Sequence, residues 1–444
     1  MKIRATKAVT WIVAALALAA IALWPTFVKQ RENAARAASF PAPAPVNADY
    51  LLRDRTIAFW EGMVRKHLSD DMLSPRQLAM QYLQRYRERG DIDDVLRARS
   101  MAGRSLREQP RGNIGADVAL ASVEVTLHQF KAALAETKQL ERIDPTEIQM
   151  RIREASLDLE LGDYANAQRI IAHLPPRKSF DIARDTLVAR YDELTGRLAE
   201  AREIFERTTA EQNSILDTPA QQRAWFFFRS GEIAFEAGDN DTALDDEDQA
   251  LAIFPNYADA NRLKARFDCA LKRWAECRGA AAASATVVPY PETLGYEEDA
   301  DRALGATAEA DRIADLIRTI EKIGNAQHIS DRLLAIYYAE HRIHTADAFA
   351  IARRELRARD DIFTEDTLAW AAAADGRWNE ARVAAGKALR FDTENSLLQY
   401  HAGIIALHFG DREEAKRRFQ KALSLNPSFH PFYADDARAQ LARL

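Results

Sequence analysis

The stretch "GDREEAKRRFQKALSLNPSFHP" (residues 410–431) decides the fold, because its pattern recurs along the chain. Ala415, Phe419 and Ala422 fall on one face of a helix, and charged residues cover the rest of that helix. Gly410 precedes the helix and Pro427 follows it. Small residues stand in the same frame thirty-four residues upstream, where Gly376, Ala381 and Ala388 correspond to Gly410, Ala415 and Ala422.

The 34-residue period is found in two further regions of the chain. In the first half, Ala133, Ala167 and Ala201 follow one another at this interval. In the middle of the chain the same interval separates Ala243 from Cys277. Three regions that share one period predict an array of repeated units rather than a set of separate globular domains.

Two segments, "GEIAFEAGDNDTALDDEDQALAIFP" (231–255) and "AGIIALHFGDREEAKRRFQKALSLNP" (402–427), resemble the tetratricopeptide repeat. Each has a small residue in both helices, as with Gly231 and Ala243, and a glycine where the two helices meet. Glycine adopts the left-handed conformation of a helix end readily, and the closing proline stops the second helix. The resemblance implies antiparallel helix pairs that bury their apolar faces only by stacking on their neighbours.

The glycine frame predicts nine to ten helix hairpins over residues 76–429, and the resemblance implies that they stack into an all-α fold, a right-handed α-solenoid. We expect an N-terminal helical segment at 50–75 and a capping helix at 430–444, because a solenoid end needs a polar outer face. Extra residues around 210–218 interrupt the array. The expected units are 76–111, 114–147, 148–181, 182–215, 224–257, 258–290, 291–326, 327–361, 362–395 and 396–429.

The first 28 residues predict a basic start and one transmembrane helix. Residues 8–28, "AVTWIVAALALAAIALWPTFV", carry no charge over 21 residues, about enough to cross a hydrocarbon core of ~30 Å. Lys2, Arg4 and Lys7 precede this run. We therefore expect a single-pass anchor in the cytoplasmic membrane, with the N-terminus on its cytoplasmic side and the array in the periplasm. Residues 29–49 form a charged and Pro/Ala-rich linker. The alternative is a signal peptide that is cleaved, which leaves a secreted protein.

Composition and motifs argue against several classes of function. Residues 1–40 hold six Lys and Arg against one Glu, which leaves a net charge of −11 for residues 41–444. So acidic a chain is not expected to bind nucleic acid. The chain lacks a glycine-rich phosphate loop, an HExxH, a CxxC and a GxSxG motif, so we expect no catalytic residue, metal or cofactor.

Residues 357–411 and "LHQFKAALA" (127–135) are also similar to a group of bacterial extracytoplasmic repeat proteins that largely lack assigned biochemistry. The expected function is therefore a membrane-tethered, extracytoplasmic scaffold that binds a protein or peptide in its concave groove. A metal-dependent or enzymatic module is one alternative, and a self-assembling structural component is another. The enzymatic alternative would use a C-terminal group of histidines, namely His328, His341, His344, His401 and His408.

The resemblance also implies which residues line the groove, through five positions of each first helix. Aromatic residues and arginines, which dominate binding energy at interfaces, are frequent at these positions. The competing interpretation is that these side chains pack between successive first helices. The predicted groove residues are Trp225, Phe228, Phe235, Arg262, Arg266, Tyr338, Asp366, Trp370, Tyr400 and His408.

Cys269 and Cys277 are the two cysteines of the chain, and they flank the turn of one predicted hairpin. A disulfide requires their Cα atoms to come within about 7 Å of each other, which a tight turn permits. In the alternative, Cys277 packs as a small apolar residue in the place that Ala243 fills one unit earlier.

Overall fold

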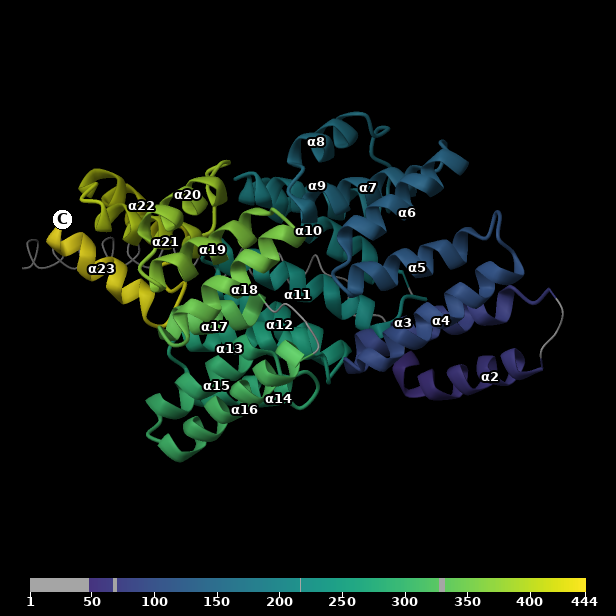
Figure 1. Cartoon of the computed structure of the whole chain (residues 1–444), viewed down its shortest axis with the longest axis horizontal. Helices are drawn as coiled ribbons and strands as arrows, with labels where there is room; N and C mark the ends of the chain where they lie inside the picture. The colour runs from purple at the N-terminus through teal and green to yellow at the C-terminus, as the bar shows by residue number, and fades with distance from the viewer. Residues whose placement is uncertain (1–47, 67–69, 216, 327–331) are drawn as a thin grey trace, which may run out of the picture.

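The computed structural model describes residues 48–66, 70–215, 217–326 and 332–444, and every regular element in these ranges is a helix (Figure 1). A short 3-10 helix, η1 (Asp49–Leu52), leads into α2 (Arg53–Arg65). Ten consecutive helix pairs follow, and the helices of each pair pack against one another. The prediction of an all-α repeat fold is confirmed.

The first five pairs come after α2. The pairs are α3 (Leu73–Arg89) with α4 (Ile92–Glu108), α5 (Ile114–Thr126) with α6 (Phe130–Ile143), α7 (Ile148–Leu161) with α8 (Tyr164–Ala172), α9 (Ile182–Leu194) with α10 (Leu198–Asn213), and α11 (Ala220–Glu236) with α12 (Asn240–Ile253).

The last five pairs end in a single helix, α23 (Tyr433–Arg443), which packs on α22. The pairs are α13 (Ala258–Ala270) with α14 (Trp274–Ala285), α15 (Pro291–Ala303) with α16 (Thr307–Ala326), α17 (Arg332–His341) with α18 (Thr345–Ala358), α19 (Ile362–Ala374) with α20 (Trp378–Ala388), and α21 (Ser396–His408) with α22 (Arg412–Leu425).

A Gly-Asp dipeptide makes the turn inside four of the pairs, and the first of them is Gly90-Asp91 between α3 and α4. Gly162 has φ +83° and ends α7 in the left-handed conformation, which glycine adopts without a Cβ clash. Asp163 then caps α8, because its side chain accepts a hydrogen bond from the backbone N–H of Asn166. Asp239 and Asp411 cap α12 and α22 in the same way after Gly238 and Gly410.

Small residues let the two helices of a pair approach closely. A Cβ built on Gly231 would lie 3.0 Å from the carbonyl oxygen of Ala243, which is fully buried. A Cβ built on Gly403 would lie 2.6 Å from the ring of Phe419. A larger side chain at either glycine would push its pair apart, which explains why the sequence pattern requires small residues there.

The array coils so tightly that one turn of the coil lies directly on the next. Gly162, in the turn of the third pair, packs against the backbone of Asp360, between the eighth and ninth pairs. The backbone N–H of Ile362 donates to the Tyr164 hydroxyl over 3.1 Å. In Figure 1 the teal α9 to α11 accordingly lie beside the green α18 and α19.

The same contact repeats in the next two pairs. The Thr393 hydroxyl donates to the carbonyl oxygen of Leu194 over 2.7 Å, and the Asn426 amide donates to that of Phe235 over 2.7 Å. These partners are 199 and 191 residues apart in sequence. A helix turn thus meets the chain five to six pairs later, which gives the length of one superhelical turn. The right-handed sense of the coil stays a prediction.

A disulfide joins Cys269 in α13 to Cys277 in α14, across the turn of the sixth pair. The Cα atoms are 5.1 Å apart, and both side chains are fully buried. Cys277 is thus bonded to Cys269 and also packs where other pairs have a small residue. The disulfide interpretation and the packing interpretation therefore both apply to this residue.

The predicted membrane anchor at residues 1–28, and the linker up to residue 47, lie outside the described residues. Among the helices from α2 to α23, none combines the length and the apolar character needed to cross a membrane.

Candidate partner-binding site

Most residues that were predicted to line the groove lie inside the array. Six of the ten are buried: Phe228, Phe235, Tyr338, Asp366, Trp370 and Tyr400. Trp225, Arg262 and Arg266 are half-buried, and His408 alone is exposed. The expectation of exposed side chains was wrong for the first six. The physical reason is that these side chains pack between neighbouring helix pairs: Phe228 meets Tyr257, Phe235 stacks on Phe267 and Trp370 meets Tyr400.

Contacts between neighbouring helix pairs occupy the predicted patch at residues 225–266. Phe235 stacks on Phe267 with ring centres 4.3 Å apart. Arg266 pairs with Glu236 over 2.8 Å, and its guanidinium lies over the Phe235 ring. Arg262 pairs with Glu292 over 3.2 Å in the same way. Since these groups already have partners inside the chain, this patch offers little free surface to another molecule.

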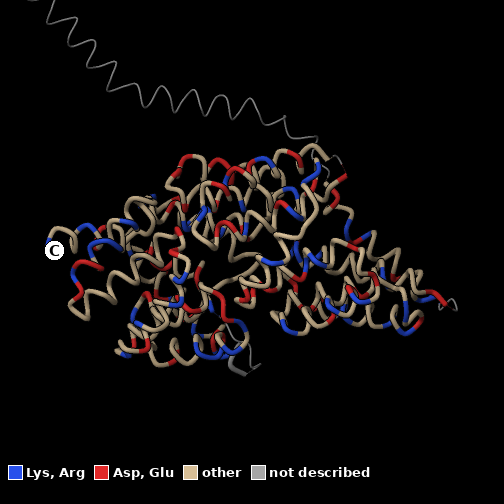
Figure 2. Tube along the Cα trace, turned by 90° about the horizontal axis from the view of Figure 1, so that it is seen from above, with Lys and Arg blue, Asp and Glu red and all other residues tan. Residues whose placement is uncertain are grey.

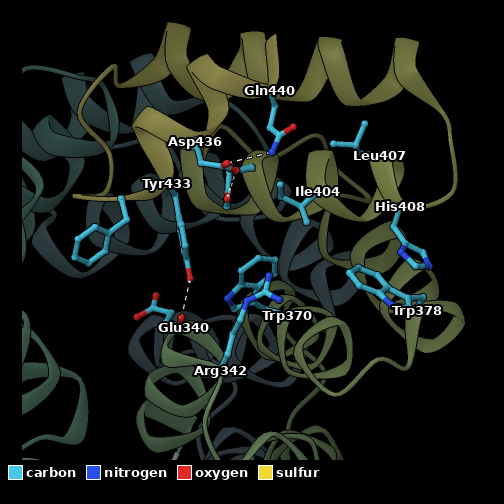
Figure 3. A pocket seen from close by; sticks show the side chains of 12 residues that line it. Glu340, Arg342, Trp370, Trp378, Ile404, Leu407, His408, Tyr433, Asp436 and Gln440 are labelled. Carbon is cyan, nitrogen blue, oxygen red and sulfur yellow. Dashed lines mark hydrogen bonds between the residues drawn. The ribbon is translucent and has the colours of Figure 1, made fainter. Parts of the chain in front are cut away.

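The C-terminal patch is different, because it borders a cavity of about 510 Å³ between the last three pairs and α23 (Figure 3). Trp370, Tyr400 and His408, three of the predicted groove residues, contribute to its wall. The residues lining the cavity are Glu340, Arg342, Trp370, Trp378, Tyr400, Ile404, Leu407, His408, Phe432, Tyr433, Asp436 and Gln440.

Aromatic rings form the inner wall of this cavity, which we call the C-terminal pocket. Tyr433 of α23 stacks on Tyr400 of α21 at 4.7 Å and meets Trp370 edge-on at 5.6 Å. Trp370 stacks on His401 at 4.2 Å and is only 5% exposed. His401 is fixed in turn by a hydrogen bond of 3.0 Å between its Nδ1 and the Asp366 carboxylate. The inner wall is therefore rigid core.

The outer wall is accessible. Trp378, at the start of α20, is half-buried and stacks on the exposed His408 with ring centres 3.7 Å apart. The same two side chains also border a neighbouring hollow of about 370 Å³. Large flat rings at the mouth of a cavity supply apolar contact area at a small entropic cost, which suits them to hold a ligand side chain.

The charged side chains around the pocket differ in how far they are neutralised or bonded by their neighbours. Arg342 is exposed, and Figure 3 shows it pointing into the pocket beside Trp370. No carboxylate of the described residues forms an ion pair with it. Asp436 accepts hydrogen bonds from the Tyr400 hydroxyl at 2.8 Å and from Gln440 at 3.1 Å. Burial raises the pKa of Glu340 to about 8, so its side chain is mostly neutral at pH 7.

The sequence alone did not predict the contribution of α23. Residues 430–444 were expected only to cap the array, yet Tyr433, Asp436 and Gln440 form one side of the pocket. Trp378 was missed as well, because it lies in a second helix, whereas only first helices were expected to line the groove. A signal existed for Tyr433, since it stands on the apolar face of the final helix.

The histidines on which the enzymatic alternative depends contact different partners and do not form one site. His341 bonds to Asp299, and His344 lies near Asp347. His401 and His408 stack on two different tryptophans, and His328 lies outside the described residues. Across the described ranges, no group of three or more His, Cys, Asp or Glu side chains is arranged to hold a metal ion.

No protein-family model matches the chain, and no curated protein does. Solved structures with similar helix arrangements include the Cut9–Hcn1 hetero-tetramer of the APC/C, at 14% identity and a TM-score of 0.45, covering 83% of this chain and 62% of that one. A human IFIT1 dimer with PPP-AAAA shows 14% identity and a TM-score of 0.48 over 72% of each chain. Yeast Tom70 shows 12% identity and a TM-score of 0.34, over 89% of this chain and 93% of that one. These values are too low to transfer a partner or an activity.

Proposed function

We propose that the chain is a tetratricopeptide-like scaffold that binds a protein or peptide partner, without catalysis, and that the C-terminal pocket receives this partner. The observation that supports the proposal is the convergence on one cavity of accessible rings from two helix pairs, Trp378 and His408, with a cation, Arg342. The rest of the coil presents Lys and Arg interspersed with Asp and Glu (Figure 2), as expected of a solvated surface rather than a nucleic-acid site.

The chemistry of the pocket indicates what part of a partner it accepts. Its volume of about 510 Å³ lies within the ~300–1,000 Å³ of ligand-binding cavities, and one large apolar side chain fills part of it. The guanidinium of Arg342 pairs with no carboxylate of the described residues, and a guanidinium can bind a carboxylate through two parallel hydrogen bonds. We therefore propose a peptide that carries an aromatic or large aliphatic residue close to an acidic residue or to a chain terminus.

A phage-displayed library of 12-residue peptides tests this proposal. We expect selected peptides to combine an apolar side chain with a carboxylate, and to bind Trp378→Ala and Arg342→Glu at least tenfold more weakly, as hot-spot residues require. Val383→Ala is the matched control, because Val383 is 63% exposed on the same helix as Trp378 and does not line the pocket. Equal affinity of all three variants would contradict the assignment.

We also propose that residues 8–28 tether the array to the cytoplasmic membrane, with the array on the extracytoplasmic side. The uncharged run and the basic residues before it support this topology. The disulfide fits the same location, because disulfides persist in oxidising compartments and are rare in the cytosol.

Alkylation followed by intact-mass measurement tests the location. In protein made with its own N-terminal segment, we expect Cys269 and Cys277 to resist alkylation until a reductant and a denaturant are added. Denatured protein from cytoplasmic expression of residues 41–444 is the control, and we expect two modified thiols there. Two alkylated thiols in denatured, unreduced protein of the first kind would contradict the extracytoplasmic location.

A further inference from the structure

The segment formed by η1 and α2 exposes three large apolar side chains that no described element covers. Leu51 is 70% exposed, Leu52 is 54% exposed and Phe59 is 59% exposed. Leu52 and Phe59 are seven residues apart, so they share one face of the helix, opposite the buried Ile57 and Val64. One exposed apolar residue needs no explanation, but three within nine residues mark an interaction surface.

Three of the four exposed charged residues between Asp49 and Lys66 are basic. Arg55, Arg65 and Lys66 are exposed there, in a chain whose residues 41–444 carry a net charge of −11. The acidic residues of the segment all have partners within the chain, and Glu61 pairs with Arg65 over 3.7 Å at the surface. Asp54 pairs with Arg85 and Arg89 of α3, Asp49 pairs with Arg53, and Glu61 accepts a hydrogen bond from the Tyr82 hydroxyl.

The position of α2 in the chain brings this face close to the proposed anchor. Residues 29–48 connect the uncharged run at 8–28 to η1, which leads directly into α2. Twenty residues span at most about 70 Å when fully extended, at roughly 3.3–3.6 Å for each residue. Of the described helices, α2 is therefore the first that the anchor would hold near the membrane surface.

We infer that the outward face of α2 lies on the surface of an anionic lipid bilayer. Leu51, Leu52 and Phe59 would enter the boundary between headgroups and acyl chains, while the three basic side chains meet anionic headgroups. This inference rests on the proposed tether only for bringing α2 to the bilayer. A second copy of the chain is a poorer occupant, because pairing two such faces would bring six cations together.

A fluorophore sensitive to lipid contact tests the inference in the full chain, reconstituted in vesicles of phosphatidylcholine with and without about one third phosphatidylglycerol. The probe is attached at Ala58→Cys, an exposed residue beside Phe59, and the control probe at Val383→Cys on α20. With lipids that carry a quencher near the headgroup, we expect at least twofold stronger quenching at position 58 than at position 383. Replacing Arg55, Arg65 and Lys66 by Glu is expected to remove this difference.

Flotation of the same samples reports the tether separately. Protein that floats while the probe at position 58 stays unquenched would overturn the inference and leave the tether intact. Protein that neither floats nor shows quenching would overturn both. Quenching that is equal with and without phosphatidylglycerol, or that survives the three substitutions, would overturn the role of the basic side chains.

Discussion

Gly162→Ala is expected to lower the free energy of unfolding by about 2–5 kcal/mol, clearly more than Gly376→Ala. Both glycines end the first helix of a pair with positive φ, +83° and +75°, so an added Cβ costs about 1–2 kcal/mol of backbone strain at either position. At Gly162 the Cβ would also overlap the carbonyl oxygen of Asp360, whereas at Gly376 it meets no atom within 4 Å. Overpacking of this kind costs about 1–3 kcal/mol more.

Urea unfolding of the two variants measures this difference, and hydrogen exchange locates it. In Gly162→Ala the amide of Ile362, which donates to Tyr164 in the wild type, should lose protection. In Gly376→Ala the amide of Ile362 should keep its protection. Equal losses of stability, with Ile362 protected in both variants, would show that the turns of the coil do not touch.

Trp370→Ala is expected to destabilise the C-terminal pairs by about 3–5 kcal/mol, because removing a buried Trp side chain leaves a cavity among packed rings. If Trp370 only lined the groove, as the sequence predicts, the result would be the opposite, weaker binding with little change in stability. The structure overturns that expectation, since Trp370 is 5% exposed and contacts Tyr400, His401 and Tyr433. Thermal and urea unfolding, followed by near-ultraviolet circular dichroism, measure the effect.

Trp378→Ala is the matched variant, because Trp378 is half-buried at the mouth of the same pocket. Its loss of stability should stay below about 1.5 kcal/mol, as for substitutions outside the core. If the two variants lose the same stability, the division of the pocket into a rigid inner wall and an accessible outer wall is incorrect.

The helix pairs were predictable because the information that defines them is local. Gly162, Gly238 and Gly410 mark turns, and the following aspartates cap the next helix, so a few neighbouring residues determine each boundary. The small residues Gly231 and Ala243 likewise report a contact within one pair.

The coil contacts were not predictable, because they depend on the summed rotation of five to six pairs. Thr393 and Leu194 are 199 residues apart, and nothing in a 34-residue period says that they meet. First-helix aromatics such as Phe235 fit both a groove and a packed position in the sequence, and the structure buries this ring against Phe267 of the next pair. A prediction of the pocket would also have required a second long-range contact. The final helix α23 folds back so that Tyr433 stacks on Tyr400.

The central claim is that the C-terminal pocket receives a partner peptide. Photo-crosslinking in cells tests it most directly, with a benzoylphenylalanine residue placed at His408 in one sample and at Val383 in another. The account predicts that position 408 crosslinks to one segment of another protein, that Arg342→Glu abolishes this product, and that position 383 gives none. Equal crosslinking at both positions, or a product formed only with a second copy of this chain, would contradict it.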